Sequence, residues 1–198
     1  YQNYVAWTER TGTRMDKLFL CDLTTMETTT LHMFSNTSYG QSLPSLMDGV
    51  LVWADAERSG STDEEDVSVI YSVRLGSTSI QSIHTETYAH DPISNGQYTA
   101  WLDAHHSLQT KLYCMAQGAS EPTLVAQGVV QFGMGNKFIA YSKDEAIYLY
   151  RFDNKKTYKL SGEYEKAQFM GVSDGKVIWM DVTSRERDIL KYSEVPDR

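Results

Sequence analysis

Hydrophobic and polar positions repeat along this chain in five copies of one pattern. Each copy begins with a mostly hydrophobic tetrapeptide that ends in an aromatic residue. These tetrapeptides are Tyr4–Trp7, Val50–Trp53, Tyr98–Trp101, Phe138–Tyr141 and Lys176–Trp179. Their aromatic residues follow one another at intervals of 38 to 48 residues. A pattern that recurs at such a period indicates stacked supersecondary units.

Two further runs in each repeat also predict strands. The second run is short and rich in aliphatic and aromatic residues, which favours a strand over a helix. It occupies residues 17–21, 69–73, 111–115, 146–150 and 188–192. The third run is more polar, as suits an outer strand with one edge in water. It occupies residues 28–34, 79–85, 122–127 and 156–161.

A turn signal stands just before four of the five tetrapeptides. The four signals are Asp48-Gly49, Asn95-Gly96, Gly135-Asn136 and Asp174-Gly175. Asp-Gly and Asn-Gly favour a type I′ hairpin, which needs positive φ at both central residues. Each signal therefore predicts a tight connection into the strand that carries the aromatic residue.

This connectivity resembles that of the TolB-type, WD40-like β-propeller repeats. In that family, the segment that ends in the Asp-Gly turn is the innermost strand of a blade, and the aromatic phrase is the second strand. Residues 42–49 and 91–96 look like degenerate copies of the family's Pro-containing inner-strand motif, whereas the last two units lack the proline. The motif reports blade geometry and no activity, so the resemblance transfers no functional residue.

The sequence thus predicts an all-β chain of four-stranded antiparallel blades, forming a five-bladed or incomplete β-propeller. Residues 1–198 are expected to be a single propeller domain or a fragment of one. Residues 41–85, 88–127 and 128–161 are expected to form three complete blades. Residues 1–34 and 163–195 are expected to form a partial blade at each end. Because the chain starts at Tyr1 and begins and ends inside a blade, we expect it to be a piece of a longer protein.

Composition and net charge limit the classes of partner that this chain is expected to bind. The chain has 198 residues, 41% of them hydrophobic, and a formal net charge of −8. Nucleic acid and anionic membranes are bound by clustered Lys and Arg, so neither is expected as a partner. No stretch approaches the roughly 20 apolar residues of a membrane span. Cys21 and Cys114 are expected to be buried, on opposite faces of their sheets and without a disulfide.

The repeated aromatic residues allow two interpretations. They could form a surface on which sugars stack, or they could pack between neighbouring blades. Their position inside a central strand favours packing, because aromatic residues dominate such cores. We therefore expect Trp53, Trp101 and Trp179 to be largely buried.

Acidic residues and histidines supply the candidate metal ligands. Asp55, Asp103 and Asp181 each stand two residues after a tryptophan, where they could bind cations or simply cap loops. The acidic loop at residues 57–66 could bind calcium, although a solvated loop fits it better. Asp103 with His105 and His106 is a weak transition-metal candidate. No metal or cofactor is predicted.

The sequence also offers one catalytic alternative. Asp91 lies at the start of a predicted inner strand, and Glu163 and Glu165 begin another. A glycosidase needs two carboxyl groups a few ångströms apart, and these three residues are the candidates. A carbohydrate-active propeller, either glycosidase or lectin, is therefore the alternative function.

The favoured function is a non-catalytic interaction or scaffold module that binds a protein or a surface polymer through its loops. The family resemblance favours a bacterial envelope or secreted protein. Further expected partners are the rest of the parent chain and a second copy, because partial blades leave strand edges open at Tyr4–Trp7 and Ile189–Tyr192. Exposed edges are normally paired or covered.

Overall fold

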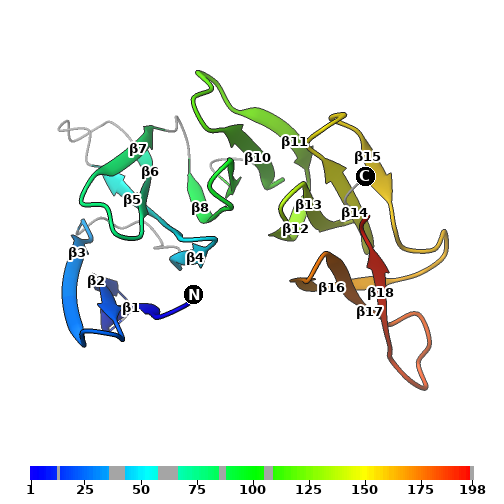
Figure 1. The fold of residues 1–198 in the computed structure, drawn as a ribbon. Helices are drawn as coiled ribbons and strands as arrows, with labels where there is room; N and C mark the ends of the chain where they lie inside the picture. The colour runs from blue at the N-terminus through cyan, green and yellow to red at the C-terminus, as the bar shows by residue number, and fades with distance from the viewer. Residues whose placement is uncertain (13, 36–42, 58–66, 85–87, 105–108, 197–198) are drawn as a thin grey trace. The chain divides into compact units, whose positions relative to one another are not determined.

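The computed structural model is built from strands, and its described residues contain no helix (Figure 1). The structure describes residues 1–12, 14–35, 43–57, 67–84, 88–104 and 109–196. Within them, 18 strands form five antiparallel sheets. The prediction of an all-β chain is confirmed. In the described ranges, nothing has the helical length and hydropathy that crossing a membrane requires.

The first two sheets contain three and four strands. The first has the order β1-β2-β3, with bounds Tyr4–Thr11, Arg14–Asp22 and Glu27–Met33. The second has the order β4-β5-β6-β7, with bounds Ser45–Met47, Val50–Glu57, Val67–Arg74 and Ile80–His84. The aromatic tetrapeptide lies in β1 and in β5. In the second sheet, the short segment before the Asp-Gly turn forms the edge strand β4, as an inner blade strand should.

The remaining three sheets repeat this arrangement. The third has the order β8-β9-β10-β11, with bounds Ala89–Ser94, Tyr98–Asp103, Lys111–Ala116 and Thr123–Gln127. The fourth has the order β12-β13-β14-β15, with bounds Val129–Met134, Phe138–Lys143, Ala146–Arg151 and Thr157–Lys159. The fifth has the order β16-β17-β18, with bounds Ala167–Ser173, Lys176–Asp181 and Ile189–Glu194.

Only two of the four turn signals have positive φ at both residues. Asp48 and Gly49 have φ of 48° and 75°, and Asp174 and Gly175 have φ of 48° and 71°. In the Asn95-Gly96 turn only Gly96 is positive, at 81°, and the Gly135-Asn136 turn has no positive φ. The hydrogen bonds from Asn95 N to Tyr98 O and from Gly135 N to Phe138 O explain the difference. They move the centre of each turn one residue along the chain.

The chain divides into two compact units, which we describe separately. One comprises residues 1–108 and 113–123, and the other comprises residues 109–112 and 124–198. Cys21 and Cys114 are both buried, as predicted, and they are not joined by a disulfide.

The tryptophans of the central strands are buried between sheets, as predicted. In the first unit, Trp53 packs with Leu18 of the first sheet, and Trp101 packs with Ala54 and Ile70 of the second sheet. In the second unit, Trp179 packs with residues of the fourth sheet that include Ile147 and Leu149. Trp53, Trp101 and Trp179 expose 5% of their surface or less. Each therefore holds its own sheet against the sheet before it.

In four of the five sheets, the aromatic residue that ends the tetrapeptide stacks on an aromatic residue of the neighbouring strand. Trp7 stacks on Phe19, with ring centroids 5.2 Å apart. The corresponding pairs are Trp53–Tyr71 at 5.6 Å, Trp101–Tyr113 at 6.0 Å and Tyr141–Tyr148 at 5.5 Å. In the fifth sheet, Lys191 takes the place of the aromatic partner, opposite Trp179.

Candidate functional site

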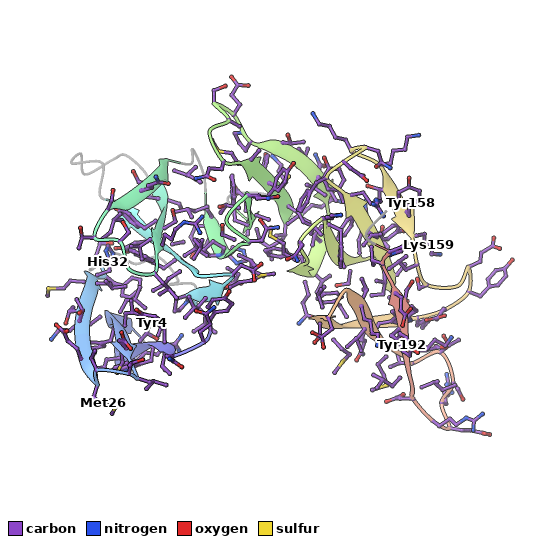
Figure 2. All side chains as sticks on the ribbon, viewed as in Figure 1. Tyr4, Met26, His32, Tyr158, Lys159 and Tyr192 are labelled. Atoms are coloured by element: carbon purple, nitrogen blue, oxygen red, sulfur yellow. The ribbon has the colours of Figure 1, made fainter. Side chains whose placement is uncertain are left out.

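Asp55 follows Trp53 by two residues and is buried at the end of β5. His32 Nε2 donates a hydrogen bond to Asp55 Oδ2 over 2.7 Å. Ser35 donates two more to the same carboxylate, from its backbone N over 2.9 Å and from Oγ over 2.7 Å. Figure 2 shows His32 on β3, in the sheet before that of Asp55. The carboxylate is thus a structural link between two sheets, which neither sequence interpretation anticipated.

Asp181 holds the same position after Trp179 and belongs to a second polar cluster. Lys191 Nζ lies 2.7 Å from Asp181 Oδ2 and 2.9 Å from Glu165 Oε2. Trp179 Nε1 donates a hydrogen bond to Glu165 Oε1, and Gly162 N donates one to Glu165 Oε2 over 3.2 Å. We call Glu165, Trp179, Asp181 and Lys191 the Lys191 cluster. Lys191 therefore replaces the usual aromatic partner with an ionic one.

The Lys191 cluster keeps its carboxylates charged. Hydrogen bonds from Lys191 and Thr183 lower the pKa of Asp181 to about 2. Burial opposes ionisation of Glu165, but hydrogen bonds from Lys191, Trp179 and Gly162 outweigh it and lower the pKa of that carboxyl. Hydrogen bonds to Asp181, the larger cause, and to Glu165 raise the pKa of Lys191 in turn. A general acid needs a raised carboxyl pKa, so this arrangement suits an ion-pair network better than acid catalysis.

Asp91 and Glu163, the other two carboxyls of the glycosidase alternative, are more exposed. Asp91 Oδ2 lies 2.9 Å from His90 Nδ1, and its side chain is 54% exposed. The hydrogen bond from His90 lowers the pKa of Asp91, against the effect of partial burial. Glu163 is exposed, and its backbone carbonyl accepts a hydrogen bond from Lys159. Asp91 belongs to the first unit, and Glu163 and Glu165 belong to the second.

The candidate metal ligands lie partly outside the described residues. Asp103 is buried at the end of β9. His105 and His106, and most of the acidic loop at residues 57–66, fall outside the described ranges. Within those ranges, no three His, Cys, Asp or Glu side chains come close enough together to hold a metal ion.

A pocket of about 480 Å³ opens in the first unit, where the turns of the second and third sheets lie. Five serines and three glutamines line it, together with Thr99, Tyr98 and a few apolar side chains. Arg74 at the end of β6 is the only charged side chain among the described lining residues. None of these described residues is Asp, Glu, His, Lys or Cys. We call this the Arg74 pocket.

Hydrogen bonds fix the wall of the Arg74 pocket at the β8–β9 turn. Ser94 Oγ donates to Tyr98 O over 3.1 Å and accepts from Gly96 N over 3.2 Å and from Thr99 Oγ1 over 3.1 Å. Gln97 O accepts a hydrogen bond from Gln117 N over 2.7 Å, which attaches the β10–β11 turn. The turns that form the pocket are therefore held in place before any ligand arrives.

A shallower pocket in the second unit also contains an arginine, but that arginine is bonded within the chain. It measures about 400 Å³ and lies beside β14, β15 and the end of β18. Its Arg151 is 2.8 Å from Asp153 and also donates to Pro196 O over 3.3 Å. That cation already has partners within the chain. For the guanidinium of Arg74, no described residue is an acceptor.

Comparison with known proteins identifies the fold. No family model matches the chain, and no curated protein matches it. An acylaminoacyl peptidase from Pyrococcus horikoshii is 12% identical with a TM-score of 0.63, over 90% of this chain and 33% of that one. The β-propeller domain of the Trilobed protease from Pyrococcus furiosus is 11% identical with a TM-score of 0.67, and the match covers 97% of this chain and 63% of that one. TolB from Acinetobacter baumannii is 13% identical with a TM-score of 0.60, over 98% and 50%.

The chain has a β-propeller fold. At these identities the likeness shows the fold alone, and the chain spans from a third to under two thirds of the length of these proteins. The predicted fold class, with three four-stranded blades and a three-stranded blade at each end, is confirmed. The sheets are accordingly called blades from here on. The Arg74 pocket lies where hairpin turns of blades two and three meet, and the sequence motifs gave no signal for it.

Proposed function

We propose that this chain is a non-catalytic binding module that holds a protein or a surface polymer through the turns around the Arg74 pocket. One observation carries the proposal. The described residues of the pocket present many groups that donate and accept hydrogen bonds, but they include no acid, base or activated nucleophile. Its volume falls in the range of about 300–1,000 Å³ that is usual for ligand pockets.

Its serines are poor candidates for catalysis. A serine hydroxyl attacks a substrate only when an adjacent base removes its proton. His, Asp, Glu and Lys supply that base in most such sites, and none of them is among the described residues that line the Arg74 pocket. Hydroxyl and amide groups without a base bind and orient a ligand. The arrangement therefore supports recognition and does not support turnover.

Two further findings support the same proposal. Glu165 and Asp181, the carboxyls of the Lys191 cluster, are engaged in structural bonds with Lys191. Among the solved structures, one similar propeller is a domain of a protease. A propeller beside a protease supports a polypeptide ligand over a surface polymer.

A nuclear magnetic resonance titration tests the proposal. Peptide pools and oligosaccharide pools are added to the labelled chain, and the amide signals of Gly96, Gln97 and Gly118 in the pocket lining are followed. We expect saturable shifts at these amides, with the added molecules recovered intact by mass spectrometry. A bulky Ser82→Trp change inside the pocket should abolish the shifts. The same change at exposed Ser184, outside the pocket, should leave them.

The carbohydrate alternative predicts a different outcome of this experiment. If an oligosaccharide is cleaved, and if Asp91→Ala abolishes cleavage while the spectrum of the folded chain persists, the binding-module proposal is wrong. The glycosidase assignment of Asp91 with Glu163 and Glu165 then replaces it. Intact recovery of every oligosaccharide argues against the glycosidase.

A further inference from the structure

Arg74 is placed so that its guanidinium reaches from one blade to the next. The residue ends β6 of blade two, where its backbone pairs with Val50. A Cβ atom built on Gly96, in the β8–β9 turn of blade three, would lie only 3.2 Å from Arg74 Nη2. The guanidinium therefore lies against the Gly96 turn, and the missing side chain of this glycine makes the room.

The charge of Arg74 has no counterpart in its pocket. Among the described residues, no carboxylate lines the pocket and none accepts a hydrogen bond from the guanidinium. The chain as a whole is acidic, with a formal net charge of −8, so a lone cation in a polar recess is a local exception. A planar guanidinium matches a carboxylate through two parallel hydrogen bonds.

The neutral groups around Arg74 fit a peptide better than a sugar. Gln81, Gln97 and Gln117 each carry an amide that both donates and accepts, which suits the N–H and C=O groups of a peptide bond. Sugar sites usually add an exposed aromatic face, but Trp53 and Trp101 of these two blades are buried. Tyr98 is the only aromatic residue in the part of the lining that the structure describes.

We propose that the Arg74 pocket binds the C-terminal carboxylate of a peptide, with Arg74 holding the carboxylate and the pocket's glutamines and hydroxyls holding the last peptide groups. This assignment rests on the proposed binding function, because it names the ligand class of the same pocket. Capture of a chain terminus in a recess of hydrogen-bonding groups is a known mode of peptide recognition.

The experiment compares two pools of N-acetylated tripeptides that differ only at the C-terminus. One pool ends in a free carboxylate and the other in a carboxamide, and each is titrated while the Gly96, Gln97 and Gly118 amides are followed. We expect the free-carboxylate pool to bind at least about tenfold more tightly, because a charge-assisted pair is stronger than a neutral one. Its affinity should fall as salt is added.

Variants of Arg74 test whether this residue makes the distinction. Arg74→Gln should lower the affinity for the carboxylate pool to that for the carboxamide pool and leave the latter unchanged. Arg74→Lys keeps the charge but not the planar fork, and should retain part of the preference. Arg185→Gln removes the same charge from an exposed position outside the pocket and should change neither affinity. Unchanged spectra away from the pocket show that each variant folds.

The outcomes separate this proposal from the proposed function. Equal affinities for the two pools overturn the carboxylate as ligand, and a preference that survives Arg74→Gln overturns the role given to Arg74. Both results leave the binding function standing. Tighter binding of oligogalacturonate than of any peptide at the same amides overturns the peptide as ligand. If no probe moves these amides at millimolar concentration, the proposed function fails as well.

Discussion

At the scale of single residues, Trp101 lies in a cluster with Ala54, Ile70 and Ala89 that joins blades two and three. Replacing it with alanine removes a large buried side chain and leaves a cavity. We expect Trp101→Ala to lower the free energy of unfolding by about 3–5 kcal/mol. Denaturant unfolding followed by circular dichroism measures this change.

Trp7 supplies the matched control for that prediction. It occupies the same position in blade one, but it is 38% exposed and its main ring contact is Phe19. Trp7→Ala should therefore cost only about 1 kcal/mol, the usual value for losing one aromatic pair. Similar costs for the two substitutions would show that burial between blades does not decide the role of these residues.

The Lys191 cluster makes stability depend on pH in the acid range. Asp181 and Glu165 are more acidic in the folded chain than in the unfolded chain, so they favour the folded state above about pH 4. This contribution is lost as the pH falls toward the Asp181 pKa of about 2. Lys191→Met should flatten this part of the stability profile, because it removes the cation that lowers both pKa values.

A second lysine on the same sheet is the control for the pH experiment. Lys176 lies 3.8 Å from Glu194, and both side chains are well exposed. Exposed pairs of this kind contribute little to stability. Unfolding curves of Lys176→Met between pH 2 and 5 should parallel those of the unsubstituted chain. An unchanged slope in Lys191→Met would contradict the role given to the Lys191 cluster.

Individual side chains show where sequence reasoning stops. The burial of Trp53 and Trp101 could be predicted because a fixed place in a repeat implies a fixed place in the packing. The hydrogen bond from His32 to Asp55 could not be predicted, because His32 lies 23 residues earlier in the chain and belongs to no repeated motif. Arg74 was missed for a similar reason, because its setting depends on Gly96 in the next blade. Contacts that recur at the same place in every repeat leave a pattern in the sequence, and contacts made in one place only do not.

At the scale of elements, the β13–β14 turn has a conformation that its sequence does not favour. Asp144 and Glu145 have φ of 50° and 56°, the type I′ pattern that Asn-Gly adopts most easily. Exchanging this pair for Asn-Gly should raise the free energy of unfolding by about 0.5–1 kcal/mol, because glycine carries no Cβ to strain there. The exposed Glu145–Lys166 ion pair that is lost offsets little of this gain.

The reverse exchange is a test of the same reasoning. Gly175 has φ of 71° in the β16–β17 turn, and a Cβ there would meet only Val195 O, at 3.9 Å. Gly175→Ala should therefore destabilise by about 1–2 kcal/mol through backbone strain alone. Equilibrium unfolding in guanidinium chloride should give opposite signs for the two turns. Equal signs would contradict the assignment of strain to φ.

The strands themselves were largely predictable. The aromatic tetrapeptides and the runs after them correspond to strands of the structure, because alternation and β-branched content act locally. A loop was expected after Lys143, but the positive φ of Asp144 and Glu145 was not, because this pair lacks the glycine of the usual type I′ signal. Only Asp144 and Glu145 lie between the end of β13 and the start of β14, so the connection is a tight turn. The pairing of these two strands holds the turn in place.

At the scale of the whole molecule, the first and last blades have three strands each. Within the described residues, β1 pairs only with β2 and β18 pairs only with β17. Leu190 and Tyr192 on β18 are 64% and 62% exposed, and Figure 2 labels Tyr192. Open edges of this kind favour pairing with another strand.

We therefore expect the two terminal edges to pair, either within one chain or between copies. Light scattering should show association that grows with concentration, or hydrogen exchange should show protected outward amides in β1 and β18. Leu190→Lys with Tyr192→Lys should reduce either signal, because charges at an edge oppose pairing. A concentrated monomer with fast exchange at both edges would contradict this expectation.

The distribution of the four tryptophans makes the chain its own optical reporter. Blades one, two, three and five each contain one, and blade four has Tyr141 in that place. Trp53 and Trp101 have indole N–H groups with no hydrogen-bond partner among the described residues, whereas that of Trp179 bonds to Glu165. The emission wavelengths of these three buried tryptophans should therefore differ from that of the exposed Trp7. Single-tryptophan variants would show whether the blades unfold together or one after another, as stacked repeats can.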